Sequence, residues 1–340
     1  MGNNKLTRRG FLGTSAAALG AVALATPLAK AMASTPTAPQ TPAIGDFGTK
    51  FGGVQIGAIT YSWRDMPAGL ENIIKYCKET GINSLELMSG DLEMFLGAPE
   101  SPARNFPRPP RGERRPPLTA EQQAAMDKYN ADLRAFRLGV NPARVAAARK
   151  LFDDAGIGVH IVKFAPSRWS DEEIDYAFAT AKAMGAKAVC EEVSESAVSK
   201  LAPFATKHGM YCVFHNHNQF AEPGFSVDPF LAVAPSVMLN FDMGHYYGST
   251  GLNPSDFVRK YHDRIFSIHI KDKTGPKTDP ANTNQVWGQG ETPLAELLLL
   301  IKREGWPIYL DIELEYAIAP WSNSVKEVRT SAQYARNILI

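Results

Sequence analysis

The feature that most constrains the fold is a regular alternation of short, apolar, β-branched stretches with longer segments of helical periodicity. Strands that alternate with helices in this way pair in parallel within one sheet. Eight repeats of the unit predict an α/β fold of the (β/α)8 barrel type. An open doubly wound sheet is the competing architecture, but no Gly-x-Gly-x-x-Gly sequence follows the first stretch. The eight predicted strands are 54–61, 84–88, 158–164, 186–193, 210–217, 237–243, 265–271 and 307–314.

Capping residues mark several of the helices between these strands. Residues 141–155 begin with Asn141, a residue favoured at helix N-termini. Residues 170–184 open with Ser170 and Glu173, the spacing of a capping box. A third helix is predicted at 254–262.

One segment interrupts the alternation after the second predicted strand. Residues 90–118 are rich in proline and carry five arginines, and a helical pattern follows at 119–135. The whole insertion, 90–138, leaves the carboxyl end of a strand, which is the face where barrels of this type place their sites. Two hypotheses remain open for it: a lid or subunit contact in a homo-oligomer, or a disordered, solvated loop.

The N-terminal residues predict an export signal. Arg8 and Arg9 stand before Gly-Phe-Leu, an alanine-rich apolar stretch follows, and small residues suited to cleavage end at Ala31 or Ala33. This pattern resembles a twin-arginine signal, which directs folded proteins to the periplasm. We therefore expect a signal peptide at 1–33, a linker at 34–50 and the catalytic barrel at 51–340. After cleavage we expect no stable membrane insertion; the alternative is an uncleaved anchor.

Charge and cysteine content restrict the partners. The chain has 36 basic and 35 acidic residues, a net charge of +1, so no overall field favours nucleic acid. We expect no nucleic-acid partner and a small ligand. Cys77, Cys190 and Cys212 each lie in an apolar segment and are predicted to be buried free thiols, with one disulfide as the alternative.

Polar side chains, acidic or imidazole except for one lysine, stand at the carboxyl ends of six of the eight predicted strands. In a parallel barrel these ends converge on one mouth. A charge that follows an uninterrupted apolar run costs several kcal/mol unless it is paired, and a shared divalent cation would remove that cost. Mixed nitrogen and oxygen ligands suit Mn, Co, Zn or Fe ions, and the sequence does not choose among them. The residues are Glu86, either Glu191 or Glu192, His215, His217, Asp242, His245, His269, Lys271, Glu313 and Glu315.

Such an ion could assist proton removal from a sugar-like substrate. It would polarise the carbonyl and hydroxyl oxygens of a sugar-like substrate and acidify the neighbouring C–H, so that a carboxylate can remove its proton.

Several longer motifs then point to a family. They are VFHNHNQF (213–220), LNFDMGH (239–245), GLNPSDFVRKYHDRIFSIHIKDK (251–273), GQGETPLAELLLLIKREGW (288–306) and IYLDIELEY (308–316). Together they resemble the xylose isomerase-like TIM-barrel superfamily, often called sugar phosphate isomerases/epimerases, over residues 53–340. The resemblance implies a small carbohydrate substrate, without naming it.

The resemblance also implies roles for individual residues. Ketose 3-epimerases of this family hold one metal ion with a Glu, an Asp, a His and a Glu from strands five to eight. Asp242, His269 and Glu313 match the last three, and His245 matches a histidine that contacts substrate. His215 stands where those enzymes carry the first glutamate. Since they use both metal-bound glutamates as opposed acid and base, this departure leaves two alternatives: His215 binds the ion and relays a proton, or Glu192 supplies the missing carboxylate.

The resulting prediction is a metal-dependent isomerase or epimerase of an unphosphorylated sugar or keto-sugar. The alternatives are a lyase or dehydratase acting on 3-keto-glycosides and a non-catalytic sugar-binding barrel. Glu313 and His215 are the predicted catalytic residues. The predicted metal ligands are His215, Asp242, His269 and Glu313, and the predicted substrate-binding residues are Glu86, Glu192, His217, His245 and Lys271.

Overall fold

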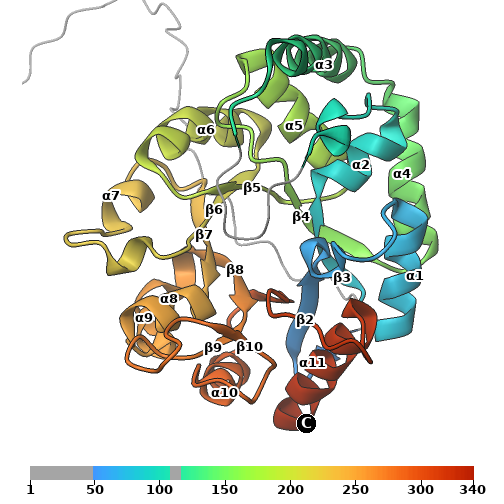
Figure 1. The fold of residues 1–340 in the computed structure, drawn as a ribbon. Coiled ribbons are helices and arrows are strands. Elements are labelled where there is room, and N and C mark those ends of the chain that lie inside the picture. Colours follow the sequence, from blue (N-terminus) through green and yellow to red (C-terminus); the bar gives the residue numbers. More distant parts are fainter. Residues whose placement is uncertain (1–48, 108–115) are drawn as a thin grey trace, which may run out of the picture. The chain divides into compact units, whose positions relative to one another are not determined.

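The computed structural model describes residues 49–107 and 116–340. Eight parallel strands form a closed ring in which neighbours along the chain are also neighbours in space, and the last strand, β11, pairs with the first, β2. The predicted (β/α)8 TIM barrel is confirmed (Figure 1). The ring consists of β2 (Val54–Ile59), β3 (Ser84–Met88), β4 (Gly158–Lys163), β5 (Ala188–Glu192), β6 (Tyr211–His215), β7 (Val237–Asp242), β8 (Ile265–Ile270) and β11 (Tyr309–Ile312).

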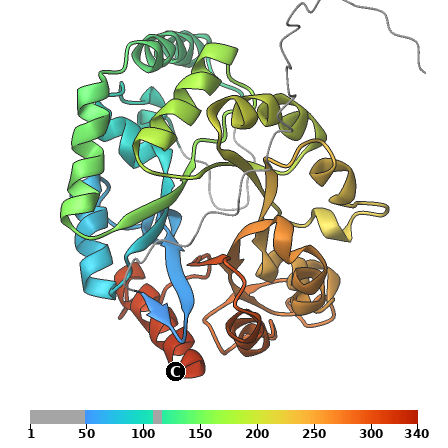
Figure 2. The same cartoon turned by 180° about the vertical axis from the view of Figure 1, so that it is seen from behind.

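Helices surround the ring on all sides, as the two opposite views show (Figures 1 and 2). The Asn141 cap and the Ser170–Glu173 capping box predicted from the sequence are both present. Apart from α3, described below, the α-helices are α1 (Leu70–Thr80), α2 (Ser89–Leu96), α4 (Pro142–Asp154), α5 (Asp171–Ala183), α6 (Glu195–His208), α7 (Asp228–Leu231), α8 (Met243–Thr250), α9 (Pro254–Tyr261), α10 (Leu294–Glu304) and α11 (Ser324–Leu339).

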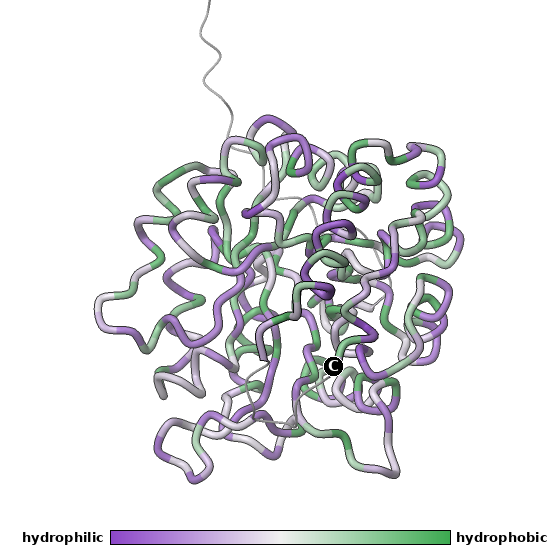
Figure 3. Tube along the Cα trace, turned by 45° about the horizontal axis from the view of Figure 1, so that its top comes forward, coloured by the Kyte–Doolittle hydropathy of each residue, from purple (hydrophilic) through white to green (hydrophobic). Residues whose placement is uncertain are grey.

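The apolar side chains form two separate cores. The larger core lies between the strands and the helices, whose mixed polarity along the chain (Figure 3) reflects one buried and one solvated face. The smaller core fills the inside of the barrel, because alternate residues of each strand point to its axis. It consists of Ile161, Ala188, Cys190, Tyr211, Val213, Met238, Phe266 and Tyr309. All three cysteines are buried and free, as predicted.

Two short hairpin pairings extend the barrel. Strand β1 (Lys50–Phe51) pairs antiparallel with β2 at the start of the described chain. Strands β9 (Asp272–Lys273) and β10 (Asn284–Gln285) pair in the connection that follows β8. The carboxylate of Asp272 accepts backbone hydrogen bonds from Gly288, Gly290 and Thr292, and thereby fixes this connection beside the barrel mouth.

The insertion is folded wherever the structure describes it. The helix predicted at 119–135 is confirmed as α3 (Ala120–Leu138), which begins with a Thr119–Gln122 capping box. Its buried Arg137 hydrogen-bonds Glu93 of α2 at 2.8 Å and Glu173 of α5 at 3.2 Å. A buried ion-pair network therefore fastens α3 to α2 and α5. A lid or subunit-contact role of the insertion stays a prediction. Residues 108–115 lie outside the described residues.

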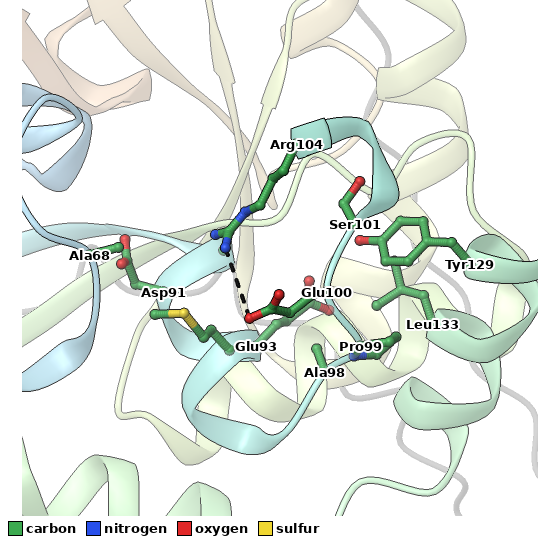
Figure 4. Close-up of a pocket in the computed structure, with 12 residues that line it drawn as sticks. Ala68, Asp91, Glu93, Ala98, Pro99, Glu100, Ser101, Arg104, Tyr129 and Leu133 are labelled. Carbon is green, nitrogen blue, oxygen red and sulfur yellow. Dashed lines mark ion pairs between the residues drawn. The ribbon is translucent and has the colours of Figure 1, made fainter. Parts of the chain in front are cut away.

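A cavity of about 330 Å³ lies within this insertion, and all of its lining residues except Ala68 belong to residues 90–138. Tyr129 and Leu133 of α3 face Pro99 and Glu100 across it, and Glu100 forms an ion pair with Arg104 (Figure 4). None of its lining residues belongs to the acidic and imidazole set predicted to bind metal.

The predicted export signal at 1–33 and almost all of the predicted linker fall outside the described residues. Within residues 49–107 and 116–340, no helix has the length and apolar character needed to cross a membrane.

Candidate active site

The strand ends bring four of the predicted residues together at the carboxyl mouth of the barrel. His215 ends β6, Asp242 ends β7, His269 lies near the end of β8, and Glu313 follows β11. One ligand atom from each lies within 4.8 Å of those of the other three, and all four side chains are buried. The predicted convergence of these residues is therefore present.

The donor set fits a divalent cation. Ligand atoms about 2.0–2.2 Å from one ion lie at most about 4.4 Å apart, which is close to the 4.8 Å within which these four lie. Nδ1 of His215 is buried without a hydrogen-bond partner among the described residues, although a buried imidazole nitrogen normally has one. Two imidazoles and two carboxylates suit a transition metal more than calcium.

Lys271 is the cation in closest contact with these carboxylates. Its ammonium lies 2.8 Å from Asp242 Oδ2, 2.9 Å from Glu313 Oε2 and 2.7 Å from Glu315 Oε2. Burial alone would raise the pKa of the Glu313 carboxyl, but Lys271 and His269 overcome burial and hold that pKa well below its usual value. Burial is likewise outweighed at Glu315, where His245 and Lys271 lower the pKa to about 2. Both carboxylates are therefore ionised.

Both ring nitrogens of His269 contact a carboxylate. Its Nδ1 lies 2.9 Å from Glu313 Oε2, and its Nε2 lies 2.9 Å from Glu86 Oε2. Burial would lower the pKa of His269, but Glu86 and Glu313 raise it well above its usual value. A nitrogen that binds metal must be free of its proton, so uptake of an ion by His269 would release one.

Glu86, predicted to bind substrate, lies beneath His269. Its side chain is fully buried and accepts a hydrogen bond from Asn240 Nδ2 at 2.7 Å. A carboxylate on the second nitrogen of a ligating histidine fixes the orientation of its ring. Glu86 therefore orients His269, and its predicted contact with substrate stays a prediction.

Asp242 is fixed by groups on either side of it. Its Oδ1 accepts a 2.7 Å hydrogen bond from the backbone N–H of His245 and so caps helix α8. The side-chain amide of Asn216 accepts from the Asp242 backbone N–H at 2.9 Å and donates to its carbonyl at 3.1 Å. The sequence analysis missed Asn216, although its place directly after His215 was a usable signal. With Oδ1 occupied, Oδ2 is the oxygen that faces the site.

The contacts of the two glutamates of β5 show that Glu192, and not Glu191, faces the barrel mouth. Glu191 accepts hydrogen bonds from the backbone N–H groups of Ser167 and Glu192, at 2.8 and 2.9 Å. Glu192 lies two residues after Cys190 of the inner core, and its Oε1 lies 2.8 Å from the ammonium of Lys163. Sequence reasoning missed Lys163, which the alternation after Ile161 also places on the inner face.

Two partly exposed histidines complete the mouth. His217 Nε2 lies 3.5 Å from Glu192 Oε2, and His245 Nε2 lies 3.4 Å from Glu315 Oε2. Nitrogen atoms of His215, His217 and His245 also lie within 4.8 Å of one another. These side chains give the mouth hydrogen-bonding groups for a polar ligand above the buried cluster.

Comparisons with solved structures show the same fold at low identity. A sugar phosphate isomerase/epimerase from Parabacteroides distasonis is 17% identical, with a TM-score of 0.50, over 88% of this chain and 100% of that one. A probable 3-DHS dehydratase, AsbF, from Bacillus anthracis is 12% identical, with a TM-score of 0.54, over 82% and 98%. A D-psicose 3-epimerase is 11% identical, with a TM-score of 0.52, over 84% and 99%.

A comparison with curated proteins finds no match. Residues 49–338 match the family described as "Xylose isomerase-like TIM barrel", which covers the whole barrel of this chain. The chain belongs to the xylose isomerase-like TIM barrel family.

Proposed function

We propose that this protein is a divalent-metal-dependent isomerase or epimerase of a small sugar or keto-sugar. The observation that carries the proposal is the buried cluster of His215, Asp242, His269 and Glu313, whose ligand atoms lie within 4.8 Å of one another at the barrel mouth. Burying a carboxylate or an imidazole costs free energy unless it contacts a ligand or pairs with another buried group. The clustering of four such groups at one barrel mouth therefore supports a functional site.

Those four side chains would hold the ion, which would polarise the oxygen atoms of a bound keto-sugar and acidify the adjacent C–H. Glu313 is the base that would remove this proton. Lys271 and His269 keep its carboxylate ionised through contacts of 2.9 Å each. His215, predicted to be both ligand and catalytic residue, has its pKa lowered well below the usual value by burial, Lys163 and His269. A neutral imidazole of this kind can bind metal or accept a proton.

The rim of the mouth supplies the substrate contacts. Lys271 and His245 contact Glu315, and His217 contacts Glu192, so donors and acceptors lie side by side at the mouth. Alternating donors and acceptors suit the hydroxyl groups of a carbohydrate, which donate and accept hydrogen bonds at once.

A lyase or dehydratase acting on 3-keto-glycosides is the second candidate. Elimination next to a carbonyl needs one base and one bound carbonyl, and Glu313 with the ion would supply both. Release of water or an aglycone, without a sugar isomer, distinguishes this reaction from isomerisation.

We also propose that the protein acts in the periplasm after twin-arginine export. The support is the sequence Arg8-Arg9-Gly-Phe-Leu and the apolar stretch after it. Replacing Arg8 and Arg9 with lysine should leave full-length protein in the cytoplasmic fraction. A protein found in the periplasmic fraction despite this double change would contradict the proposal.

The test of the activity is solvent exchange. Protein reconstituted with Mn²⁺ is incubated in D₂O with each D-ketohexose and with 3-keto-glucosides, and deuterium entry at carbon is followed by NMR. We expect deuterium at the carbon next to the carbonyl. Glu313→Gln should abolish this exchange, whereas Glu191→Gln, an equal change at a carboxylate outside the site, should not. An absence of exchange across the panel would refute the proposal.

A further inference from the structure

Lys273 is a buried lysine that the proposed reaction does not use. It belongs to β9, which packs against α8 (Figure 1), and only 3% of its surface is exposed. Its backbone is hydrogen-bonded on both sides, because its N–H donates to Thr292 Oγ1 at 3.0 Å and its carbonyl accepts from the N–H of Glu291 at 2.9 Å. The fold therefore fixes the place from which this side chain starts.

The ammonium of Lys273 has no counter-charge in contact with it. Within residues 49–107 and 116–340 it forms no ion pair, and its hydrogen bond to Nδ1 of His245 is long, at 3.5 Å. A lysine ammonium has three N–H donors and no acceptor, so this contact leaves donors unused. Burying an unpaired charge is costly, and a ligand that brings an acceptor and a negative charge would remove the cost.

The other lysines at the mouth are paired. Lys163 contacts Glu192 at 2.8 Å, and Lys271 contacts three carboxylates at 2.9 Å or less. Burial would lower the pKa of both, but the acidic groups around them raise it above its usual value. For Lys273, burial and the positive charge of Lys271 prevail and lower the pKa. This contrast is expected if Lys273 alone of the three lacks a carboxylate partner.

The carboxylates of the metal cluster do not supply the missing charge. The three that contact Lys271 would be balanced by its ammonium and a divalent ion. His245 stands between them and Lys273, with Nε2 at 3.4 Å from Glu315 and Nδ1 toward the lysine. Because an ammonium can only donate, Nδ1 is the acceptor and Nε2 carries the proton. Lys273 thus lies on the side of His245 away from the cluster, with its charge uncompensated.

Two asparagines add unpaired acceptors beside this ammonium. Asn284 is the cross-strand partner of Lys273 in the β9–β10 hairpin, so both side chains lie on the same face. A β-carbon added at Gly248 of α8 would lie 2.9 Å from Lys273 Cε and closer still to Asn282 Oδ1, so that amide is next to the lysine stem. Oδ1 of each asparagine is buried and has no donor in the described part of the chain. One charged donor with two acceptors suits an anionic group that has hydroxyls beside it.

We propose that Lys273 forms an anion subsite for a carboxylate of the substrate, so that the protein acts on keto-sugar acids such as keto-uronates. This inference rests on the proposed function and deepens it, because it names the substrate class. The ammonium donates to the carboxylate, and Asn282 and Asn284 accept from neighbouring hydroxyls. A carboxylate carries one negative charge, which matches one unpaired lysine. A phosphate ester carries about two at neutral pH and would need a second cation.

The experiment measures binding and reaction with the same ligands. Mn²⁺-loaded wild type, Lys273→Met and Lys150→Met are titrated by calorimetry with D-fructose, D-fructuronate and D-fructose 6-phosphate, and with the three corresponding tagatose compounds. The members of each set differ only at carbon 6. Deuterium entry from D₂O is then followed by NMR for every ligand. Lys150→Met removes the same charge from an exposed position on α4 and is the control.

We expect wild type to bind the acids at least about 10-fold more tightly than the neutral ketoses, the effect of one hydrogen bond to a charged group. Lys273→Met should lose this preference and keep its affinity for the neutral ketoses. Lys150→Met should behave as wild type. The phosphate esters should bind no more tightly than the acids.

Several outcomes would overturn the inference while leaving the proposed function standing. Wild type could fail to prefer the acids, or Lys273→Met could keep that preference. Equal loss of acid and neutral ligands in Lys273→Met, at unchanged melting temperature, would show that Lys273 does not recognise the carboxylate. A Lys273-dependent preference for the phosphate esters would assign the subsite to phosphate. The proposed function fails differently: Lys273-dependent binding of acids without deuterium entry from any ligand would refute the isomerase and leave the anion subsite.

Discussion

Lys271→Met tests whether the ammonium of Lys271 stabilises the buried carboxylates at the barrel mouth. The ammonium of Lys271 is 2% exposed and lies within 2.9 Å of Asp242, Glu313 and Glu315. Methionine keeps the apolar stem and removes the charge, which leaves Asp242 and Glu313 buried without this cation. Breaking a buried ion pair from one side costs about 3–5 kcal/mol. Glu315 adds little to this cost, because 25% of its side chain is exposed to solvent.

The assay is urea unfolding in EDTA, followed by tryptophan fluorescence, for wild type and Lys271→Met. We expect the variant to lose about 3–5 kcal/mol in the free energy of unfolding. Since Asp242 and Glu313 are also predicted metal ligands, Mn²⁺ should reduce the difference in free energy of unfolding between wild type and Lys271→Met. An ion at 100 times its dissociation constant stabilises the folded state by about 2.7 kcal/mol, and it should bind more tightly once Lys271 no longer competes for the carboxylates.

Lys273→Met is the matched control. Lys273 is equally buried and belongs to the same segment, but its ammonium contacts Nδ1 of His245 at 3.5 Å, and no ion pair joins it to a described carboxylate. Burial and Lys271 lower the pKa of Lys273. Its replacement should therefore change stability by less than about 1 kcal/mol. Equal losses of unfolding free energy in the two variants would refute the reasoning. So would a loss in Lys271→Met that Mn²⁺ leaves unchanged.

Three further predictions concern stability. Arg137→Ala should lower the free energy of unfolding in urea by about 3–5 kcal/mol and speed hydrogen exchange of the α3 amides. Arg134→Ala, at the exposed edge of the same network, should lower the free energy of unfolding by less than about 1 kcal/mol. The pKa of Glu315 falls from 4.5 to about 2, so its ionisation stabilises the fold above pH 4.5 and this gain is lost toward pH 2; the stability gap between wild type and Glu315→Gln in urea should shrink as pH falls through this range. Gly244→Ala would place a β-carbon 2.7 Å from the backbone oxygen of Lys271, and calorimetry should show a loss of about 1–3 kcal/mol.

The barrel could be predicted from the sequence because each strand carries its own local signal. All eight predicted strands are present, with ends that differ by at most a few residues. The convergence of His215, Asp242, His269 and Glu313 was predictable for a related reason, since parallel strands in a closed ring bring their carboxyl ends together whatever the details of packing. His160, which the chain places inside β4, is hydrogen-bonded to Ser84 and Asp311 within the core.

Residues whose role depends on register could not be predicted in the same way. β3 and β4 shift register between Leu85 and Glu86, before Ile161, so alternation counted from the start of β4 does not reveal that Lys163 faces the axis. The choice between Glu191 and Glu192 likewise needed the contact of Glu191 with Ser167. The docking of α3 depends on Arg137 meeting Glu93 and Glu173, which lie far from it in the chain. These are tertiary contacts, and local patterns do not encode them.

The most direct test of the central claim is the metal content of the purified protein. The account predicts that equilibrium dialysis against Mn²⁺, Co²⁺, Zn²⁺ and Fe²⁺, followed by elemental analysis, finds at least one of these ions tightly bound in wild type. That ion should be lost in Asp242→Ala and in His269→Ala and retained in Glu191→Gln. Wild type that binds none of the four metals, or alanine variants that keep the full metal content, would contradict the claim that these side chains share one ion.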